Sequence, residues 1–188
     1  MNTSAQTSAR DAVMPPQSAA TEPKQYLTFL LGTETFAIGI LAIKEIIEYG
    51  NPTEIPMMPD CVRGVINLRG AVVPVLDLHA RFGRSPAAAT KRTCNVIVEM
   101  GAHRQARVIG VIVDAVNEVI DISDADIEPA PDFGTRIRGE FIRGIGKVRG
   151  SFVIVLDVDK ILALDELVTL DSIDASAHRD EPGSELSS

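Results

Sequence analysis

The hydrophobic residues of this chain fall in short runs that end at glycine, proline or charged residues, a pattern typical of β-strands. Residues 25–31 and 36–40 form two such runs around a short loop that contains glycine, which predicts a β-hairpin. Residues 41–48 fit either a helical turn or a strand, because their isoleucines also recur at helical spacing. Residues 111–121 are so rich in Val and Ile that we expect a strand there. The pattern therefore predicts a chain dominated by β-structure.

The same plan occurs twice along the chain. Residues 62–78 read VRGVINLRGAVVPVLDL, and residues 142–158, at an offset of eighty positions, read IRGIGKVRGSFVIVLDV. Eight of these seventeen pairs are identical, namely Arg63/Arg143, Gly64/Gly144, Arg69/Arg149, Gly70/Gly150, Val73/Val153, Val75/Val155, Leu76/Leu156 and Asp77/Asp157. Upstream, residues 45–48 (EIIE) match residues 118–121 (EVID). Two units are too few for a solenoid, so we predict a fused pseudo-dimer of two small β-units.

The most apolar strand of the repeat predicts how the units meet. Residues 71–76 are apolar throughout instead of alternating, which is typical of a strand that is covered on both faces. In a small barrel, one face would fill the barrel and the other would meet the second unit. Pro74 lacks a backbone donor and so predicts an edge or a bulge. Gly64 interrupts the preceding apolar run, which predicts a bulge or a close backbone approach.

The repeat also sets the predicted domain boundaries. The expected segments are a first β-barrel unit at residues 25–86, a linker at 87–92 and a second β-barrel unit at 93–158. The sequence leaves open whether the two units exchange strands. Apolar residues at helical spacing predict an amphipathic C-terminal helix at residues 159–172. The polar N-terminal extension 1–24 and the acidic tail 173–188 have the composition of disordered segments.

Composition and charge narrow the classes of function. The chain has no Trp and only 4% aromatic residues, so we expect an aliphatic core. A net charge of −8 opposes nucleic-acid binding, which depends on cations that neutralise phosphates. The sequence shows no long apolar run and no secretory leader, so we expect no membrane insertion and a cytoplasmic location. The two cysteines and three histidines lack the spacing of a metal site, and we expect neither a metal nor a cofactor.

The repeat offers one catalytic alternative, a pseudo-dimeric hydrolase in which Asp77 and Asp157 act as paired carboxylates. Both aspartates follow an apolar strand, however, where an Asp ordinarily caps the next turn or helix. The sequence also shows no Ser-His-Asp order, no dinucleotide-binding G-x-G-x-x-G after a strand and no phosphate-binding loop. We therefore expect no catalytic residues, and we assign Asp77, Asp157, Gly70, Gly144 and Gly150 to turns and caps.

The order and spacing of these motifs resemble a known family. The run V-R-G-V-I-N-L-R-G-A-V-V-P-V-L-D-L, preceded by A-I-K-E-I-I and followed by I-E-P-A-P-D-F and I-R-G-I-G-K-V-R-G, is similar to the CheW-type chemotaxis coupling proteins. The resemblance covers about residues 25–170. It implies two five-stranded barrels of the Src-homology type, related by a pseudo-twofold axis, and no catalytic activity. It also implies an adaptor that joins chemoreceptor tips to the chemotaxis histidine kinase in membrane-associated receptor arrays. A stand-alone relative of the kinase regulatory domain, which shares the fold, is the alternative.

The same resemblance implies roles for particular residues. The positions that match contacts with the kinase regulatory domain are Arg69, Glu45 and Ile43. The positions that match receptor coupling are Gly64, Val65, Val111 and Val113. The second R-G block departs from the family pattern through its additional basic residues Arg143, Lys147 and Arg149, so the roles of the first unit are not transferred to it. The expected partners are therefore the kinase regulatory domain and the cytoplasmic tip of a methyl-accepting chemoreceptor.

Overall fold

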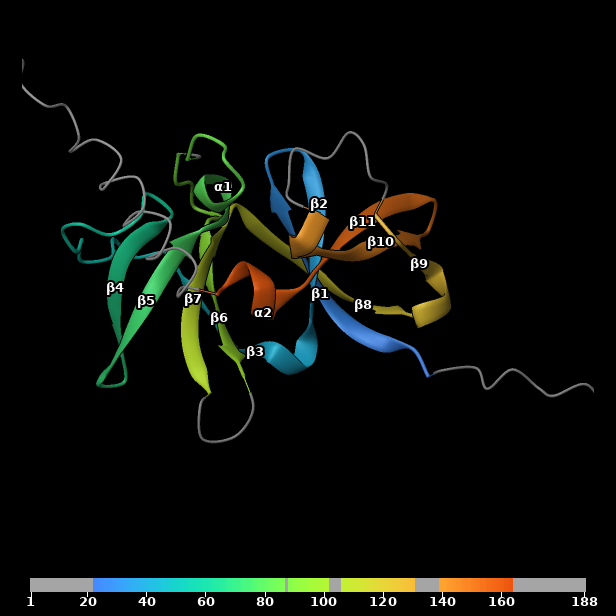
Figure 1. Cartoon of the computed structure of the whole chain (residues 1–188), viewed down its shortest axis with the longest axis horizontal. Helices are drawn as coiled ribbons and strands as arrows, with labels where there is room; N and C mark the ends of the chain where they lie inside the picture. Colours follow the sequence, from blue (N-terminus) through green and yellow to red (C-terminus); the bar gives the residue numbers. More distant parts are fainter. Residues whose placement is uncertain (1–21, 87, 102–105, 131–138, 164–188) are drawn as a thin grey trace, which may run out of the picture.

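The computed structural model describes residues 22–86, 88–101, 106–130 and 139–163 (Figure 1). Within these ranges the strands form two sheets. The six-stranded sheet has the order β8 (Ala115–Ile122), β1 (Lys24–Leu31), β2 (Glu34–Gly39), β11 (Ser151–Leu156), β10 (Ile142–Val148), β9 (Ile127–Glu128). The five-stranded sheet has the order β3 (Ile43–Glu48), β6 (Cys94–Met100), β7 (Arg107–Val113), β5 (Ala71–Asp77), β4 (Val62–Leu68). The predicted all-β class is confirmed.

Short helices connect the strands. They are η1 (Ile40–Ala42), α1 (Leu78–Arg81), η3 (Asp124–Asp126), η4 (Gly139–Phe141) and α2 (Val158–Ile161). Of the predicted C-terminal helix at 159–172, the described residues contain only the short helix α2, which ends at Ile161, and residues 164–172 lie outside the described residues. Most of the predicted N-terminal extension and the tail 173–188 also lie outside them. Among the described residues, no helix is long and apolar enough to cross a membrane.

The two sheets exchange hairpins. The β1–β2 hairpin comes from the first half of the sequence but pairs with β8 and β11 of the second half. The β6–β7 hairpin comes from the second half and pairs with β3 and β5 of the first half. The boundaries predicted at 25–86 and 93–158 therefore separate the two repeats and not the two sheets. The exchange is reciprocal. In the repeat, β1 corresponds to β6, β2 to β7, β8 to β3, β11 to β5 and β10 to β4. With these replacements, the order β8-β1-β2-β11-β10 of one sheet becomes the order β3-β6-β7-β5-β4 of the other.

Each sheet curls until its two edges approach each other. In the six-stranded sheet, a Cβ placed on Gly146 of β10 would lie 3.2 Å from Cδ1 of Ile122 on β8. In the five-stranded sheet, Arg69 follows the edge strand β4 and contacts Glu45 on the opposite edge strand β3. A flat sheet would hold these strands apart, so the contacts support the predicted barrels.

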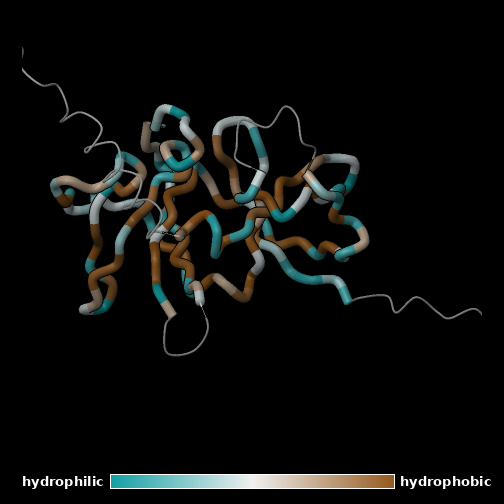
Figure 2. The backbone as a smooth tube through the Cα atoms, viewed as in Figure 1, coloured by the Kyte–Doolittle hydropathy of each residue, from teal (hydrophilic) through white to brown (hydrophobic). Residues whose placement is uncertain are grey.

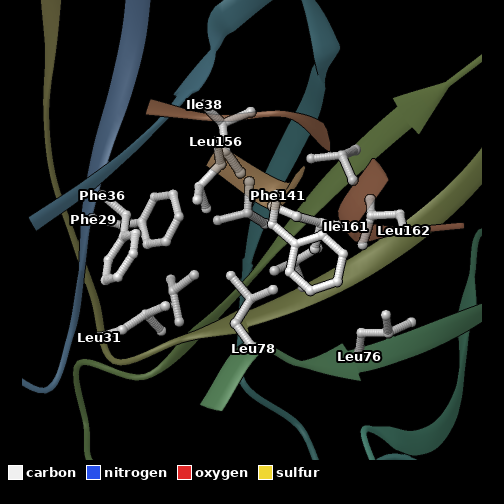
Figure 3. Close-up of a cluster of buried hydrophobic side chains, with 14 of the residues drawn as sticks. Phe29, Leu31, Phe36, Ile38, Leu76, Leu78, Phe141, Leu156, Ile161 and Leu162 are labelled. Atoms are coloured by element: carbon white, nitrogen blue, oxygen red, sulfur yellow. The ribbon is translucent and has the colours of Figure 1, made fainter. Parts of the chain in front are cut away.

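The main core lies between the two sheets. Figure 2 shows the apolar segments running along the strands and the polar segments in the connecting turns. Four phenylalanines form a chain of ring contacts through this core, with centroid distances of 6.1 Å for Phe29–Phe36, 5.8 Å for Phe36–Phe82 and 6.2 Å for Phe82–Phe141. Figure 3 shows Phe29, Phe36 and Phe141 among the surrounding leucines and isoleucines. Most of the buried residues are Val, Ile and Leu, as the composition predicts, but the few aromatic residues are gathered at one place in the core.

The apolar strand β5 differs from its prediction in two respects. It lies between β7 and β4, so the strand as a whole is not at an edge, and the edge or bulge predicted from Pro74 holds only at Pro74 itself. The parallel pairing with β7 begins only at Val75, and Pro74 therefore has a strand neighbour on the β4 side alone. Val75 and Leu76 are fully buried, whereas Val72 is exposed. The expectation of two covered faces thus holds only for the second half of the strand.

Candidate functional site

A tight turn between β4 and β5 presents Arg69. Arg69 and Gly70 both have positive φ, 53° and 89°, which is the backbone of a two-residue hairpin turn whose twist matches the strands. The Gly70 N–H donates to Asn67 Oδ1 at 2.8 Å and fixes the turn from within. The exposed guanidinium of Arg69 lies 3.0 Å from Oε2 of Glu45 on β3. Two of the residues expected to contact the kinase are thus in contact with each other, Arg69 from the turn and Glu45 from β3.

Ile43, the third residue of that group, takes a different position. It begins β3 two residues before Glu45, and its side chain is half-buried against the core between the sheets. The structure therefore makes Ile43 a support for β3 with part of its surface accessible.

Gly64 holds a proline-containing loop against β4. Its φ is +135°, and a Cβ at this position would lie 2.1 Å from the Thr53 carbonyl oxygen. Thr53 and Val65 exchange two backbone hydrogen bonds, of 2.8 and 2.9 Å. The pairing register of β4 also shifts between Val62 and Gly64, so the predicted bulge and the predicted close approach are both confirmed. The loop carries an exposed apolar group, Ile55, Met57 and Met58.

Val111 and Val113 lie in the core and not at the surface. Their exposed fractions are 1% and 0%. Val111 lines a cavity of about 10 Å³ between the sheets, together with Leu156 and Val158. Both valines are therefore inaccessible to direct contact with a partner, and Val111 lies beside Leu156 and Val158.

Leu156 and Val158 also form part of a larger groove. The groove has a volume of about 660 Å³ and lies between the start of β1, the helix η1, β10 and the end of β11 with α2. Its apolar lining includes Tyr26, Ile40, Leu41 and Ala42. Leu41 is 99% exposed. The groove is therefore a hollow with an apolar wall and an open apolar rim, a combination found at interaction sites.

Sequence reasoning missed this groove. In the segment 41–48, the isoleucines suggested one apolar face, and Leu41 added nothing to that pattern. The structure shows that both alternatives hold in part, with η1 followed by the strand β3. The helical turn directs Leu41 away from the core, and its exposure is visible only in the structure, because its place in the sequence does not distinguish it from the neighbouring apolar residues.

The comparisons with known proteins agree with this architecture. The family model described as CheW-like domain matches residues 25–166. The chain belongs to the CheW-like family. Chemotaxis protein CheW of Klebsiella aerogenes is 33% identical over 155 residues, which cover 82% of this chain and 90% of the relative. Chemotaxis protein CheW of Rhizobium meliloti is 34% identical over 143 residues, with coverages of 76% and 90%. The crystal structure of the scaffolding protein TtCheW from Thermoanaerobacter tengcongensis has a TM-score of 0.68 at 33% identity, and it covers 79% of this chain and 93% of that one.

Proteins of the CheW-like family are non-catalytic scaffold adaptors of chemotaxis, and the two repeated aspartates fit that role. The Asp77 carboxylate accepts hydrogen bonds from the backbone N–H groups of His79 and Ala80 at the start of α1. The Asp157 carboxylate accepts one from the N–H of Lys160 at the start of α2. Each aspartate is thus engaged as a helix cap. The hydrolase alternative has no support in the structure or the family.

The repeated glycines also have backbone roles. Gly70 and Gly150 have positive φ in equivalent turns. Gly144 lies where a Cβ would be 2.4 Å from Ile127 Cγ2, just as Gly64 lies against Thr53. The Gly70/Gly150 pair therefore has the same turn conformation in both sheets. Gly64 and Gly144 share only the close approach of a neighbouring segment, because only Gly64 has a positive φ, and Gly144 lies within β10 and not in a turn as expected.

Proposed function

We propose that this chain couples chemoreceptors to the chemotaxis histidine kinase by binding both at once. The observation that carries this proposal is the presence of two separate surfaces on one body. The Arg69 turn joins β4 to β5, whereas the groove is lined by residues of η1 and α2. Figure 1 shows the β4–β5 hairpin at one side of the molecule and α2 near its middle. A scaffold needs such separation, because each partner must leave the other's contact free.

The Arg69 turn is the proposed contact for the kinase regulatory domain. Arg is enriched among the residues that dominate interface energies, and a rigid turn lowers the entropy lost on binding. Glu45 holds the guanidinium in place at 3.0 Å, and Ile43 supports the strand that carries Glu45. The proposed contact therefore combines an exposed charge with a prearranged backbone.

The groove is the proposed contact for the cytoplasmic tip of the receptor. Its apolar wall can take the nonpolar side of a helix, while Lys24 and Arg143 at its rim can meet acidic residues. Val111 would affect this contact from behind, through the packing of Leu156 and Val158, whereas the fully buried Val113 would act only by supporting the core. The function would place the protein in the cytoplasm, at membrane-associated receptor arrays, through its partners.

The loop held by Gly64 and Val65 is a second candidate surface for the receptor. The exposed Ile55, Met57 and Met58 support it, because flexible methionines suit surfaces that bind apolar helices. Substitution of Leu41 by Asp and of Met57 by Ser in separate variants distinguishes the two surfaces. The groove is supported if only the Leu41 variant loses affinity for a receptor hairpin, and the loop is supported if only the Met57 variant does.

The kinase contact is tested with the two equivalent turns of the repeat. We expect Arg69→Glu to weaken binding of the kinase regulatory domain about tenfold or more in calorimetric titration, since losses above about 1.4 kcal/mol are typical of central Arg contacts. Arg149→Glu is the matched control, because Arg149 occupies the same turn in the other sheet. Equal losses in both variants would show a nonspecific charge effect, and no loss in either would remove the assigned role.

A further inference from the structure

The groove has an open apolar rim that nothing in the described residues covers. Leu41 is 99% exposed at its edge, although leucine is a residue that proteins ordinarily bury. Ile40 and Val158 contribute further apolar wall. A hollow of about 660 Å³ is large enough for several side chains of a short segment.

The chain itself supplies a segment next to this groove. Helix α2 contributes Val158 and Asp159 to the lining, and the described part of the chain ends at Ala163, a few residues later. The sequence continues as LDELVTLDSIDASAHRDEPGSELSS over residues 164–188. An extended chain spans up to about 3.5 Å per residue, so Leu167, four residues beyond Ala163, can lie up to about 14 Å from the end of the described chain, and Val158 of the lining is only a few residues before that end.

The first residues of this segment have the composition that the groove requires. Leu164, Leu167 and Val168 recur at spacings of three and four, which places them on one side of a helical turn. Residues 164–188 also contain seven acidic residues and one arginine: Asp165, Glu166, Asp171, Asp174, Asp180, Glu181, Glu185 and Arg179. The segment therefore joins a short apolar stripe to a strong negative charge.

The rim of the groove carries charges that match. Lys24 and Arg143 both line it. The two cations share one carboxylate, Asp124, at 2.6 Å from Lys24 and 3.6 Å from Arg143, so this cluster of three charged groups keeps a net positive charge. The Asp157 carboxylate caps α2, and Asp159 Oδ1 accepts a hydrogen bond from the Gly101 N–H at 3.4 Å. Both acidic residues of the lining thus have backbone partners of their own.

We propose that residues 164–170 fold back and dock in the groove, with Leu167 and Val168 against Leu41 and Val158. A tethered segment with a short linker experiences an effective concentration on the order of millimolar, so even a weak contact is mostly formed within one molecule. The segment then acts as a resident competitor for any helix that binds the groove. This consequence for receptor binding rests on the function proposed above, whereas the docking itself does not.

Docking is tested in the full chain by nuclear magnetic resonance. The double variant Leu167→Ser/Val168→Ser removes the apolar stripe. Leu186→Ser is the matched control, because it removes an apolar side chain from the same C-terminal tail but outside residues 164–170. We expect the double variant to shift the backbone amides of Lys24, Ile40 and Leu41, which are remote from residue 167 in sequence. The control should leave these amides unchanged.

Two results would overturn the docking. One is that the groove amides are the same in the wild-type chain, the double variant and the control. The other is that the shifts disappear on dilution, which would assign the contact to a second copy of the chain. Groove amides that respond to the double variant alone, at all concentrations, establish docking within the molecule.

A receptor hairpin titrated into the same variants separates this inference from the proposed function. A segment docked for about nine-tenths of the time weakens an apparent affinity about tenfold, so the double variant should bind the hairpin about tenfold more tightly. Equal affinity in wild type and double variant would overturn the competition. A hairpin that binds neither chain would refute the proposed receptor contact while leaving the docking in place.

Discussion

Arg69 and Arg149 adopt the same left-handed backbone conformation, with φ of 53° and 50°, in equivalent turns of the two sheets. Each arginine reaches a glutamate on the opposite edge strand of its own sheet, Glu45 at 3.0 Å and Glu118 at 3.5 Å. Non-glycine residues with positive φ are uncommon, and a pair at equivalent positions shows that the repeat preserves the turn itself. Three residues beyond each arginine stands an exposed apolar side chain, Val72 or Phe152.

These exposed ion pairs are expected to contribute little to stability. Surface pairs of this kind are worth about 0–1 kcal/mol, because water screens them and ordering two long side chains costs entropy. We therefore expect Arg69→Ala and Arg149→Ala each to lower the free energy of unfolding by at most about 1 kcal/mol, as measured with urea. A loss of several kcal/mol in either variant would mean that the turn is a folding element, and binding data on it would then need a new interpretation.

Gly64 and Gly70 provide a matched test of backbone geometry. Both have positive φ, but a Cβ on Gly64 would overlap the Thr53 carbonyl, whereas a Cβ on Gly70 would meet open space. Gly70→Ala should cost about 1–2 kcal/mol of backbone strain. Gly64→Ala should cost more, by roughly 1–3 kcal/mol of overpacking, and should displace the proline-containing loop. Unfolding curves of the two variants check the order, and equal destabilisation would contradict the close approach.

Asp114 connects three parts of the fold. Its carboxylate lies 3.0 Å from Nε2 of the buried His79, and it accepts a 2.6 Å hydrogen bond from the Gly32 N–H. Asp114→Ala should therefore lower the free energy of unfolding by about 1–3 kcal/mol, because it leaves the buried His79 ring without its carboxylate partner and the Gly32 N–H without its acceptor. Asp121→Ala, on the exposed side of β8, is the control and should change it by less than about 0.5 kcal/mol. Similar values for the two variants would show that the His79–Asp114 contact is not structural.

The pair Lys24–Asp124 predicts one pH-dependent effect. A hydrogen bond from Lys24, aided by the nearby charge of Arg143, lowers the pKa of the Asp124 carboxyl below its ordinary value. Because the Asp124 pKa is lower in the folded state, ionised Asp124 stabilises the fold. This stabilisation is fully present above the pKa of an ordinary Asp and is lost as the pH falls through the lowered pKa of Asp124. Lys24→Gln should raise the Asp124 pKa in a carbon-detected titration. Lys44→Gln, which disrupts the separate pair with Glu99, should leave it unchanged, and the reverse result would reject the assignment.

The sequence was sufficient for features that depend on local chemistry. The N-L-R-G turn, the caps at Asp77 and Asp157 and the close approach at Gly64 all follow from residue types at fixed spacing. The β1–β2 hairpin also follows, since its two apolar runs are joined by only a few residues. These features appear in both halves of the repeat, which strengthened each prediction.

The exchange of hairpins could not be predicted, because both arrangements bury the same residues. β1 pairs with β8 in this structure, but the equivalent strand β3 of its own repeat would offer a similar apolar pattern. Nothing local distinguishes the two partners. The burial of Val111 and Val113 was missed for a related reason, since an apolar strand between two sheets has no polar face to show which side meets solvent.

The exchange also has a consequence for how the protein is made. Tyr26 is paired with Ile120, so the first strand to leave the ribosome must wait until almost one hundred further residues have been synthesised. Such distant pairings slow folding and leave strand edges uncovered in the meantime. A nascent chain that stops before β6 could complete neither barrel, and the two halves, although they are near copies, depend on each other from the beginning.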